Sequence, residues 1–325
     1  MKATIKQAFL AAGMPEDKAD TCARVHTESS RDGVYSHGLN RVERFVEYIG
    51  KDWVDVHATP ALDINLGAME VYNGNMAPGI LNALFAMNRA TAIAEKNGLG
   101  LVSLNNTTHW MRGGAYGWQA AKEGFVFIGW TNTTAIMPTW GAIDARLGNN
   151  PLVFALPYKE EAIVLDMAMS QFSYGAMELA VLKNENLSVA GGYNNAGELT
   201  NDAGAILASK RPLPIGYWKG AGLSLLLDIL ATVLSAGLST HEISTKDVEY
   251  CLSQVFIAID ISKLGNHSVI TKTVEGIIED YHQSIAIDAS KKITYPGQRV
   301  LLTRKNNLAN GIPVVKKVWE QILEL

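Results

Sequence analysis

Two segments of the chain repeat the same order of residue types. Residues 94–98 (AEKNG) precede an apolar run at 99–104, and residues 121–124 (AKEG) precede an apolar run at 125–130; polar residues follow both runs. A helix that ends at glycine, followed by a buried strand with a polar end, accounts for each segment. Consecutive helix–strand units of this kind predict an α/β fold.

The rest of the chain adds a helical N-terminal part to this pattern. The first seventy residues are expected to be mainly helical. Further strands are expected at 152–156, 163–166 and 254–260, and further helices at 221–237, at 267–282 and twice near the C-terminus. Residues 184–204, rich in Asn and Gly, are expected to form a long loop. We therefore divide the chain into a mainly helical part, residues 1–75 with 285–325, and an α/β part, residues 76–284.

The longest apolar run, Leu223 to Leu238, decides whether a membrane is involved. It contains Asp228 and is shorter than the ~20 apolar residues that span a bilayer. A buried core helix, and no membrane partner, is therefore expected.

Charge and cysteine content exclude further classes of protein. Lys plus Arg number 28 and Asp plus Glu number 32, which gives a net charge of −4 and argues against nucleic acid as a partner. The two cysteines, Cys22 and Cys251, exclude a disulfide scaffold and predict a reducing, cytoplasmic location.

Several standard site motifs are missing from the sequence. It has no G-x-G-x-x-G, no P-loop, no G-x-S-x-G and no H-E-x-x-H. The seven histidines are scattered, so a metal hydrolase has little support and no metal site is expected. A dinucleotide, if one binds, must bind without the usual Rossmann fingerprint.

Residues 35–41, YSHGLNR, contain the first set of side chains that suits a reaction. His37 and Arg41 lie four apart, so they would share one face if the segment were helical. An arginine fork can hold a carboxylate in two parallel hydrogen bonds, and a histidine can protonate a carbonyl oxygen as hydride arrives. The pair suits reduction of a 2-keto acid. Ser36 can bond the substrate or cap a helix, and the alternative is a capping serine beside a surface histidine.

Residues 105–118, NNTTHWMRGGAYGW, follow an expected strand end, where α/β proteins tend to bind ligands. His109 and Arg112 form a second His–Arg pair. Gly113 and Gly114 permit close approach to the backbone. The aromatic residues suit a sugar-like substrate or a nicotinamide ring, or they form an aromatic core.

Three other segments are candidates for a cofactor site. Residues 216–222, GYWKGAG, open a helix with Lys219 and suit a phosphate group, although a helix start with an extended lysine also explains them. Asp166 ends an apolar strand, and residues 295–299 contain a Pro-Gly turn. Each of these last two signals is weak alone.

Taken together, these segments resemble the type-2 malate/L-lactate dehydrogenase family, which includes ureidoglycolate and sulfolactate dehydrogenases. The resemblance rests on GVYSHGLNR at 33–41, THWMRGGAYGWQAA at 108–121 and GYWKGAG at 216–222, with shorter matches in the same order along nearly the whole chain. It implies an α/β, non-Rossmann NAD(P)-binding fold in a homodimer. The helical part would then form the substrate and dimer part, and residues 76–284 the NAD-binding part.

The resemblance also implies an activity. This is NADH-dependent reduction of the C2 carbonyl of a keto sugar acid, 2,3-diketo-L-gulonate, to 3-dehydro-L-gulonate, in ascorbate-related carbohydrate catabolism. NADPH is an alternative cofactor, because Arg299 near the adenosine could accept a 2′-phosphate. Alternative functions are a malate, lactate or ureidoglycolate dehydrogenase of the same family, and a non-catalytic binding protein on this fold.

The resemblance assigns roles to individual residues. His37 is the first candidate for proton donor and His109 the second, while Ser36, Arg41 and Arg112 are expected to contact the substrate. The expected cofactor contacts are Thr133, Ile163, Val164, Leu165, Asp166, Met167, Ala168, Trp218, Lys219, Gly297, Gln298 and Arg299.

Overall fold

The computed structural model describes the backbone of residues 1–325 and every side chain except that of His267. Its helices are α1 (Lys2–Ala11), α2 (Glu16–Arg31), α3 (Val42–Gly50), α4 (Gly79–Asn97), α5 (Gly113–Lys122), α6 (Tyr174–Lys183), α7 (Ala203–Ser209), α8 (Trp218–Ser235), α9 (Thr240–Ile243), α10 (His267–His282), α11 (Gln298–Asn310) and α12 (Lys316–Leu323). Its strands are β1 (Ala61–Asn65), β2 (Met69–Asn73), β3 (Leu99–Thr107), β4 (Phe125–Thr131), β5 (Ala135–Pro138), β6 (Ala145–Gly148), β7 (Leu152–Tyr158), β8 (Glu161–Met167), β9 (Gly192–Tyr193), β10 (Leu199–Thr200) and β11 (Leu252–Asp260).

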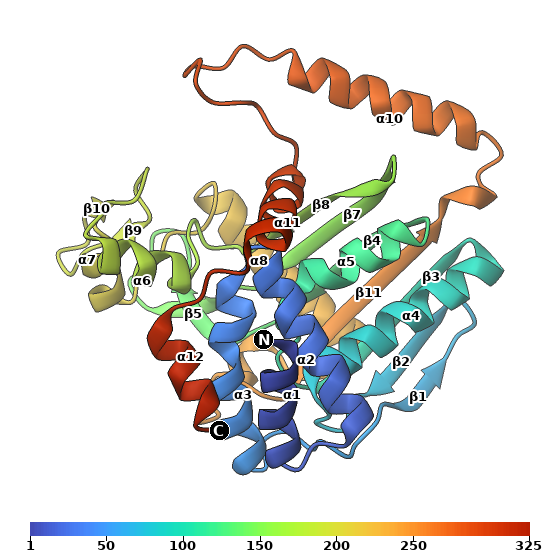
Figure 1. Cartoon of the computed structure of the whole chain (residues 1–325), viewed down its shortest axis with the longest axis horizontal. Coiled ribbons are helices and arrows are strands. Elements are labelled where there is room, and N and C mark those ends of the chain that lie inside the picture. Colours follow the sequence, from blue (N-terminus) through green and yellow to red (C-terminus); the bar gives the residue numbers. More distant parts are fainter.

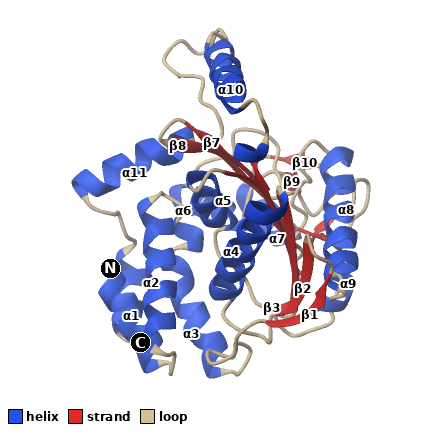
Figure 2. Ribbon diagram, turned by 90° about the vertical axis from the view of Figure 1, so that its right-hand side faces the viewer, coloured by secondary structure: helices blue, strands red, loops and turns tan.

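A seven-stranded sheet in the order β1-β2-β3-β11-β4-β7-β8 forms the centre of the molecule. Only the β2–β3 pair in this sheet is parallel, and the other neighbours are antiparallel. Helices α4 and α5 cover one face and α8 covers the other, as Figure 2 shows. The expected mixed α/β fold with an N-terminal helical part is confirmed.

The N-terminal helices α1–α3 form a separate layer outside α4 and α5, and the C-terminal helix α12 joins them (Figure 1). Apolar side chains of α1–α3 pack with Ile322 of α12 in one core cluster, while a second cluster fills the space between α4, α5 and the sheet. Helix α11 lies against α2, and α10 projects away from the rest of the molecule (Figure 1).

The two glycines expected to end helices do so. Gly98 follows α4 with φ of 87°, and its N–H donates to Ala94. Gly124 follows α5 with φ of 96°. This left-handed conformation costs glycine little, which explains why each helix stops there and the strand begins.

Three local expectations were wrong or incomplete. Within the first seventy-five residues, 61–65 and 69–73 are not helical but form β1 and β2 of the central sheet. The long loop at 184–204 includes a two-stranded hairpin of β9 and β10.

The third expectation concerns α8, which is a buried core helix on one face only. Ala221, Leu227 and Ala231 are buried against the sheet, whereas Leu226 and Val233 on the opposite face are 56% and 70% exposed. By length and composition alone α8 could cross a membrane. Its packing on the sheet instead leaves an apolar outer face, which typically marks an interaction surface.

Candidate functional site

The two candidate catalytic histidines lie side by side. The rings of His37 and His109 have centroids 5.7 Å apart and an angle of 27° between their planes. His37 comes from the short 3-10 turn Tyr35–His37 after α2, and His109 from the segment between β3 and α5. The fold thus brings together the two segments that the sequence analysis treated separately.

Hydrogen bonds orient both rings. The backbone N–H of Met111 donates to Nδ1 of His109 at 2.9 Å, so the proton of a neutral His109 resides on Nε2. Ser36 Oγ lies 2.9 Å from Nδ1 of His37. Each ring therefore uses one nitrogen to hold its orientation and keeps Nε2 for a ligand.

Both imidazoles are neutral near pH 7. Burial lowers the pKa of His109 to about 3, and the nearby Arg41 and Arg44 add to this shift. Burial also lowers the pKa of His37 to about 3, helped by His109, Arg41 and Arg112. An anion bound among these cations would raise both pKa values, because it would stabilise the imidazolium form.

His109 and Arg41 line a cavity of about 720 Å³. Its walls come from α3 and the loop after it on one side and from residues 134–136 and 246–249 on the other. Glu249 is held in this wall, where it accepts hydrogen bonds from the backbone N–H and the hydroxyl of Thr134 at 3.1 and 2.7 Å. A cavity of this size is large enough for a small organic acid.

Arg41 is a cation without a close counterion, because the carboxylates of Glu249 and Glu178 act on it only at longer range. Its Nε is buried and has no hydrogen-bond partner, and Arg41 enters no ion pair among the described side chains. Burial, and then the neighbouring Arg44, lowers its pKa. A guanidinium in this state favours an anionic ligand, and its planar fork matches a carboxylate.

The expectation that His37 and Arg41 share a helix face needs correction. Two 3-10 turns, Tyr35–His37 and Leu39–Arg41, replace the helix, and Gly38 between them has φ of −108° and ψ of −122°. A Cβ at Gly38 would lie 2.8 Å from the backbone N of Ser30. Helix α2 therefore approaches too closely for any larger residue, and the chain breaks the helix there.

Arg112 lies in a buried ion pair rather than along the cavity wall. Its Nη1 is 2.7 Å from Asp32, and both side chains are less than 5% exposed. The carboxylate of Asp32 also accepts two hydrogen bonds from Arg304, from Nε and Nη2, each 2.8 Å long. It accepts a further one from Nε of Arg31 at 2.9 Å. These guanidinium groups hold the pKa of Asp32 well below its usual range, against the effect of burial. Substrate contact by Arg112 stays a prediction.

Two of the predicted cofactor stretches lie against each other. The N–H of Val164 in β8 donates to the carbonyl of Pro296 at 3.1 Å. Gly297 has φ of 92°, and a Cβ there would lie 3.1 Å from the backbone of Val164. The amide of Gln298 is already occupied, since its Oε1 accepts from the N–H of Tyr295. Arg299 beside it is exposed.

The end of β8 connects this region to the start of α8. Ile215 donates to the carbonyl of Met169 at 2.8 Å, which brings the chain entering α8 next to the chain leaving β8. Trp218, in the first turn of α8, is 65% exposed, and the ammonium of Lys219 lies 5.9 Å from its ring. An exposed aromatic ring with a cation suits a nucleotide with its phosphates.

Asp166 occupies the junction of β8 and α5. Its Oδ2 accepts from the N–H of Gly114 at 2.8 Å, so the carboxylate lies at the N-terminus of α5. The side chain remains in contact with solvent. The protein atoms around it displace part of its hydration, and this loss of hydration raises the pKa of Asp166. A Cβ at Gly114 would lie 2.7 Å from this oxygen. The predicted close approach at this glycine is thus a contact with Asp166.

Thr133, the remaining predicted cofactor position, lies in a buried polar cluster. Its N–H donates to Oδ1 of Asn150 at 3.0 Å, and its hydroxyl accepts from the N–H of Asn149 at 2.9 Å. These contacts join the end of β4 to the segment before β7.

Sequence reasoning missed several residues of the cavity. Glu249 and Lys246 come from a loop after α9 that carries no motif, and Arg44 stands in a segment whose pattern indicates only helix. The Asp32-Gly33 pair signals a turn, but nothing in the sequence connects Asp32 with Arg112 and Arg304. Only the folded chain reveals these contacts.

Comparisons with known proteins agree with this architecture. The family model described as malate/L-lactate dehydrogenase matches residues 1–323. A 2,3-diketo-L-gulonate reductase from Pasteurella multocida is 42% identical over 326 aligned positions, which cover 100% of this chain and 98% of that protein. The protein of the same name from Citrobacter koseri is 40% identical with the same coverage.

Solved structures show the same fold. Malate dehydrogenase from Pyrococcus horikoshii superposes with a TM-score of 0.89 at 27% identity, covering 99% of this chain and 92% of that one. Sulfolactate dehydrogenase from Methanocaldococcus jannaschii superposes with a TM-score of 0.89 at 23% identity, covering 99% and 93%.

Proposed function

Because the chain belongs to the malate/L-lactate dehydrogenase family and is an oxidoreductase of that type, we propose that it reduces the C2 carbonyl of 2,3-diketo-L-gulonate with NADH, giving 3-dehydro-L-gulonate. The relatives at about 40% identity are named 2,3-diketo-L-gulonate reductase, and this name supports the proposal. The expected resemblance to this family is confirmed.

The unpaired guanidinium of Arg41 is the observation that carries the proposal. It lines the 720 Å³ cavity beside His109 and forms no ion pair with a described side chain, although Glu178 and Glu249 line the same cavity. The carboxylate of a 2-keto acid supplies the missing charge and two acceptor oxygens. Bound in this way, the acid presents its C2 carbonyl, one bond from the carboxylate, to the neighbouring histidines.

The two histidines then have different roles in the reaction. His37 protonates the C2 oxygen as the carbon receives hydride, and His109 donates a hydrogen bond from Nε2. Near neutral pH His37 is neutral in the free protein, so it must gain its proton in the complex. The substrate carboxylate favours this step, because it offsets the charge of Arg41, one of the causes of the low pKa of His37.

The nicotinamide cofactor supplies the hydride when it is bound. The residues that fit it lie along β8, at the start of α8 and at 297–299. Lys219 and Arg299 offer positive charge for phosphates, Trp218 offers an exposed ring, and Asp166 offers acceptor oxygens for hydroxyl groups. The backbone contact between Gly297 and Val164 leaves no room for a side chain at this point. We propose NADH over NADPH on the resemblance.

We further propose that the protein works in the cytoplasm as a homodimer. The exposed apolar face of α8 supports the dimer, since a second copy could cover it. Val233→Asp would place a charge on this face, and light scattering after gel filtration should then report half the mass of the wild-type particle. A wild-type protein that elutes as a monomer would contradict the dimer.

Absorbance at 340 nm tests the activity. The cofactor, NADH or NADPH, is mixed with freshly prepared 2,3-diketo-L-gulonate, oxaloacetate or pyruvate in parallel. The proposal expects the highest kcat/KM for 2,3-diketo-L-gulonate with NADH. Selective turnover of oxaloacetate or pyruvate would move the protein to the malate or lactate branch, and absence of turnover with binding of NADH would overturn the proposed reaction.

A further inference from the structure

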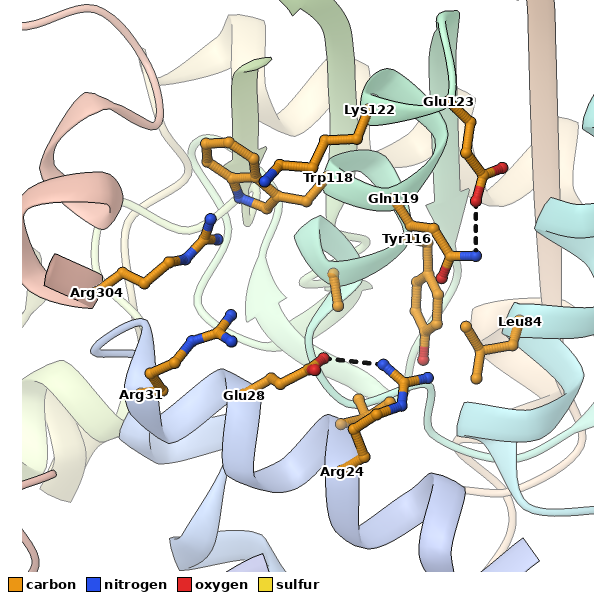
Figure 3. A pocket seen from close by; sticks show the side chains of 12 residues that line it. Arg24, Glu28, Arg31, Leu84, Tyr116, Trp118, Gln119, Lys122, Glu123 and Arg304 are labelled. Atoms are coloured by element: carbon orange, nitrogen blue, oxygen red, sulfur yellow. Dashed lines mark hydrogen bonds and ion pairs between the residues drawn. The ribbon is translucent and has the colours of Figure 1, made fainter. Parts of the chain in front are cut away.

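A second cavity, of about 480 Å³, lies between α2, α5 and the start of α4, with Arg304 of α11 at its edge. Figure 3 shows its lining side chains. It shares no lining residue with the cavity of Arg41 and His109. The proposed reaction therefore leaves it without a role.

Positive charge is in excess at one end of this cavity. Arg31, Arg304 and Lys122 point toward it in Figure 3. Behind them, two carboxylates hold the network together. Asp32 pairs with Arg31, Arg112 and Arg304, and Glu161 pairs with Lys122 at 2.9 Å and Arg304 at 3.6 Å. Four cations connected through two carboxylates leave a local excess of two positive charges.

The acidic residues that line the cavity do not cancel this excess. Glu28 is paired with Arg24 at 2.9 Å, which neutralises both. Glu123 accepts from the amide of Gln119 at 3.0 Å, and both lie at the opposite end of the cavity (Figure 3).

A buried donor without a partner lies at the same end. Trp118 is 5% exposed, lines the cavity and has no hydrogen-bond partner for its Nε1–H among the described residues. The guanidinium of Arg304 packs over its ring at 4.8 Å from the centroid. An indole N–H can only donate, and a buried donor left unpaired is costly. An oxyanion between Trp118, Arg31 and Lys122 would supply the missing acceptor.

We propose that this cavity is a binding site for a phosphate dianion, separate from the substrate cavity. The excess of positive charge at this end of the cavity suits the oxygens of a phosphate or a phosphate monoester. Trp118 also borders Gly297, because a Cβ built on Gly297 would lie 3.2 Å from Cζ2 of the indole. The phosphate can therefore belong to a free ester or to the 2′-phosphate of an adenine nucleotide.

Calorimetric titration of the full chain with inorganic phosphate, at constant ionic strength in chloride, tests the site. Wild type should show saturable binding with a dissociation constant below about 10 mM. Lys122→Gln, which removes one charge, and Trp118→Phe, which removes the N–H and keeps the aromatic packing, should each weaken binding about tenfold. Unfolding midpoints in chloride verify that both variants fold.

The double variant Arg24→Gln/Glu28→Gln is the matched control, because both residues line the same cavity and pair with each other, so replacing both leaves its net charge unchanged. It should bind phosphate within about twofold of wild type. Competition by adenosine 2′-monophosphate or by ribose 5-phosphate then identifies the source of the phosphate, and either result supports the site. Absence of saturable binding to wild type, or equal weakening in the charge-neutral double variant, would overturn the proposal.

Discussion

Replacing Arg41 by Met should damage catalysis and stabilise the free protein at the same time. Met keeps most of the length of the arginine side chain and removes its charge. In the free protein that charge is unfavourable, since Arg41 has a buried Nε without a partner and a lowered pKa. In the complex the same charge holds the substrate carboxylate.

The magnitudes follow from these two environments. Hydrogen bonds to charged groups contribute about 1.5–3 kcal/mol each, and the fork makes two. Met removes both hydrogen bonds to the substrate but leaves no unpaired guanidinium behind, so we use the lower figure for each bond. The expected loss of transition-state stabilisation is then ~3 kcal/mol, or ~10²-fold in kcat/KM. In the free protein, removal of the unpaired charge should add ~1 kcal/mol of stability, which raises the unfolding midpoint by about 1–2 °C.

Steady-state kinetics and thermal unfolding of the same preparation measure both effects. Arg44→Met is the matched control, because Arg44 lines the same cavity but is exposed, so both changes should be smaller there. An R41M protein that melts below wild type and keeps kcat/KM within about threefold would refute the reasoning, because Arg41 would then be a structural residue.

Three further outcomes are expected. His37→Gln should lower kcat by ~10²–10⁴-fold and leave the dissociation constant of NADH nearly unchanged, because only the proton donor is lost; a threefold effect would remove His37 from the mechanism. Gly38→Ala should cost about 1–3 kcal/mol in the free energy of unfolding, measured with urea, because its Cβ would meet α2; wild-type stability would contradict this contact. His26, His37 and His109 have folded-state pKa values lowered to about 4, 3 and 3, so the unfolded chain binds more protons between pH 6.5 and 3, and stability should fall as pH falls through this window. A flat unfolding midpoint from pH 7 to pH 5 would count against buried neutral histidines.

The sequence was sufficient for the parts of the fold that depend on local signals. Gly98 and Gly124 end helices because their left-handed conformation suits glycine. The apolar runs after them form strands because they can be buried between two layers of helices. The order of strands in the sheet depends on contacts between distant segments, so the position of β11 between β3 and β4 could not be predicted.

The candidate site divides in the same way. His37 and His109 were predicted from their segments and the family resemblance, but their stacking required the folded chain. The break at Gly38 follows from the closeness of α2, which periodicity cannot reveal. The pairing of Arg112 with Asp32 joins a residue in a candidate motif to one in an ordinary turn, and a single sequence contains no signal for that contact.

Hydride transfer to C2 is the central claim, and isotopic labelling tests it most directly. The enzyme is mixed with NADH carrying deuterium at both C4 positions and with 2,3-diketo-L-gulonate, and the product is trapped within seconds, before its C2 hydrogen exchanges with water. Mass spectrometry of the fragments should find one deuterium at C2. Deuterium at C3, or an unlabelled product, would contradict the arrangement of carboxylate, Arg41 and His37 proposed for this cavity.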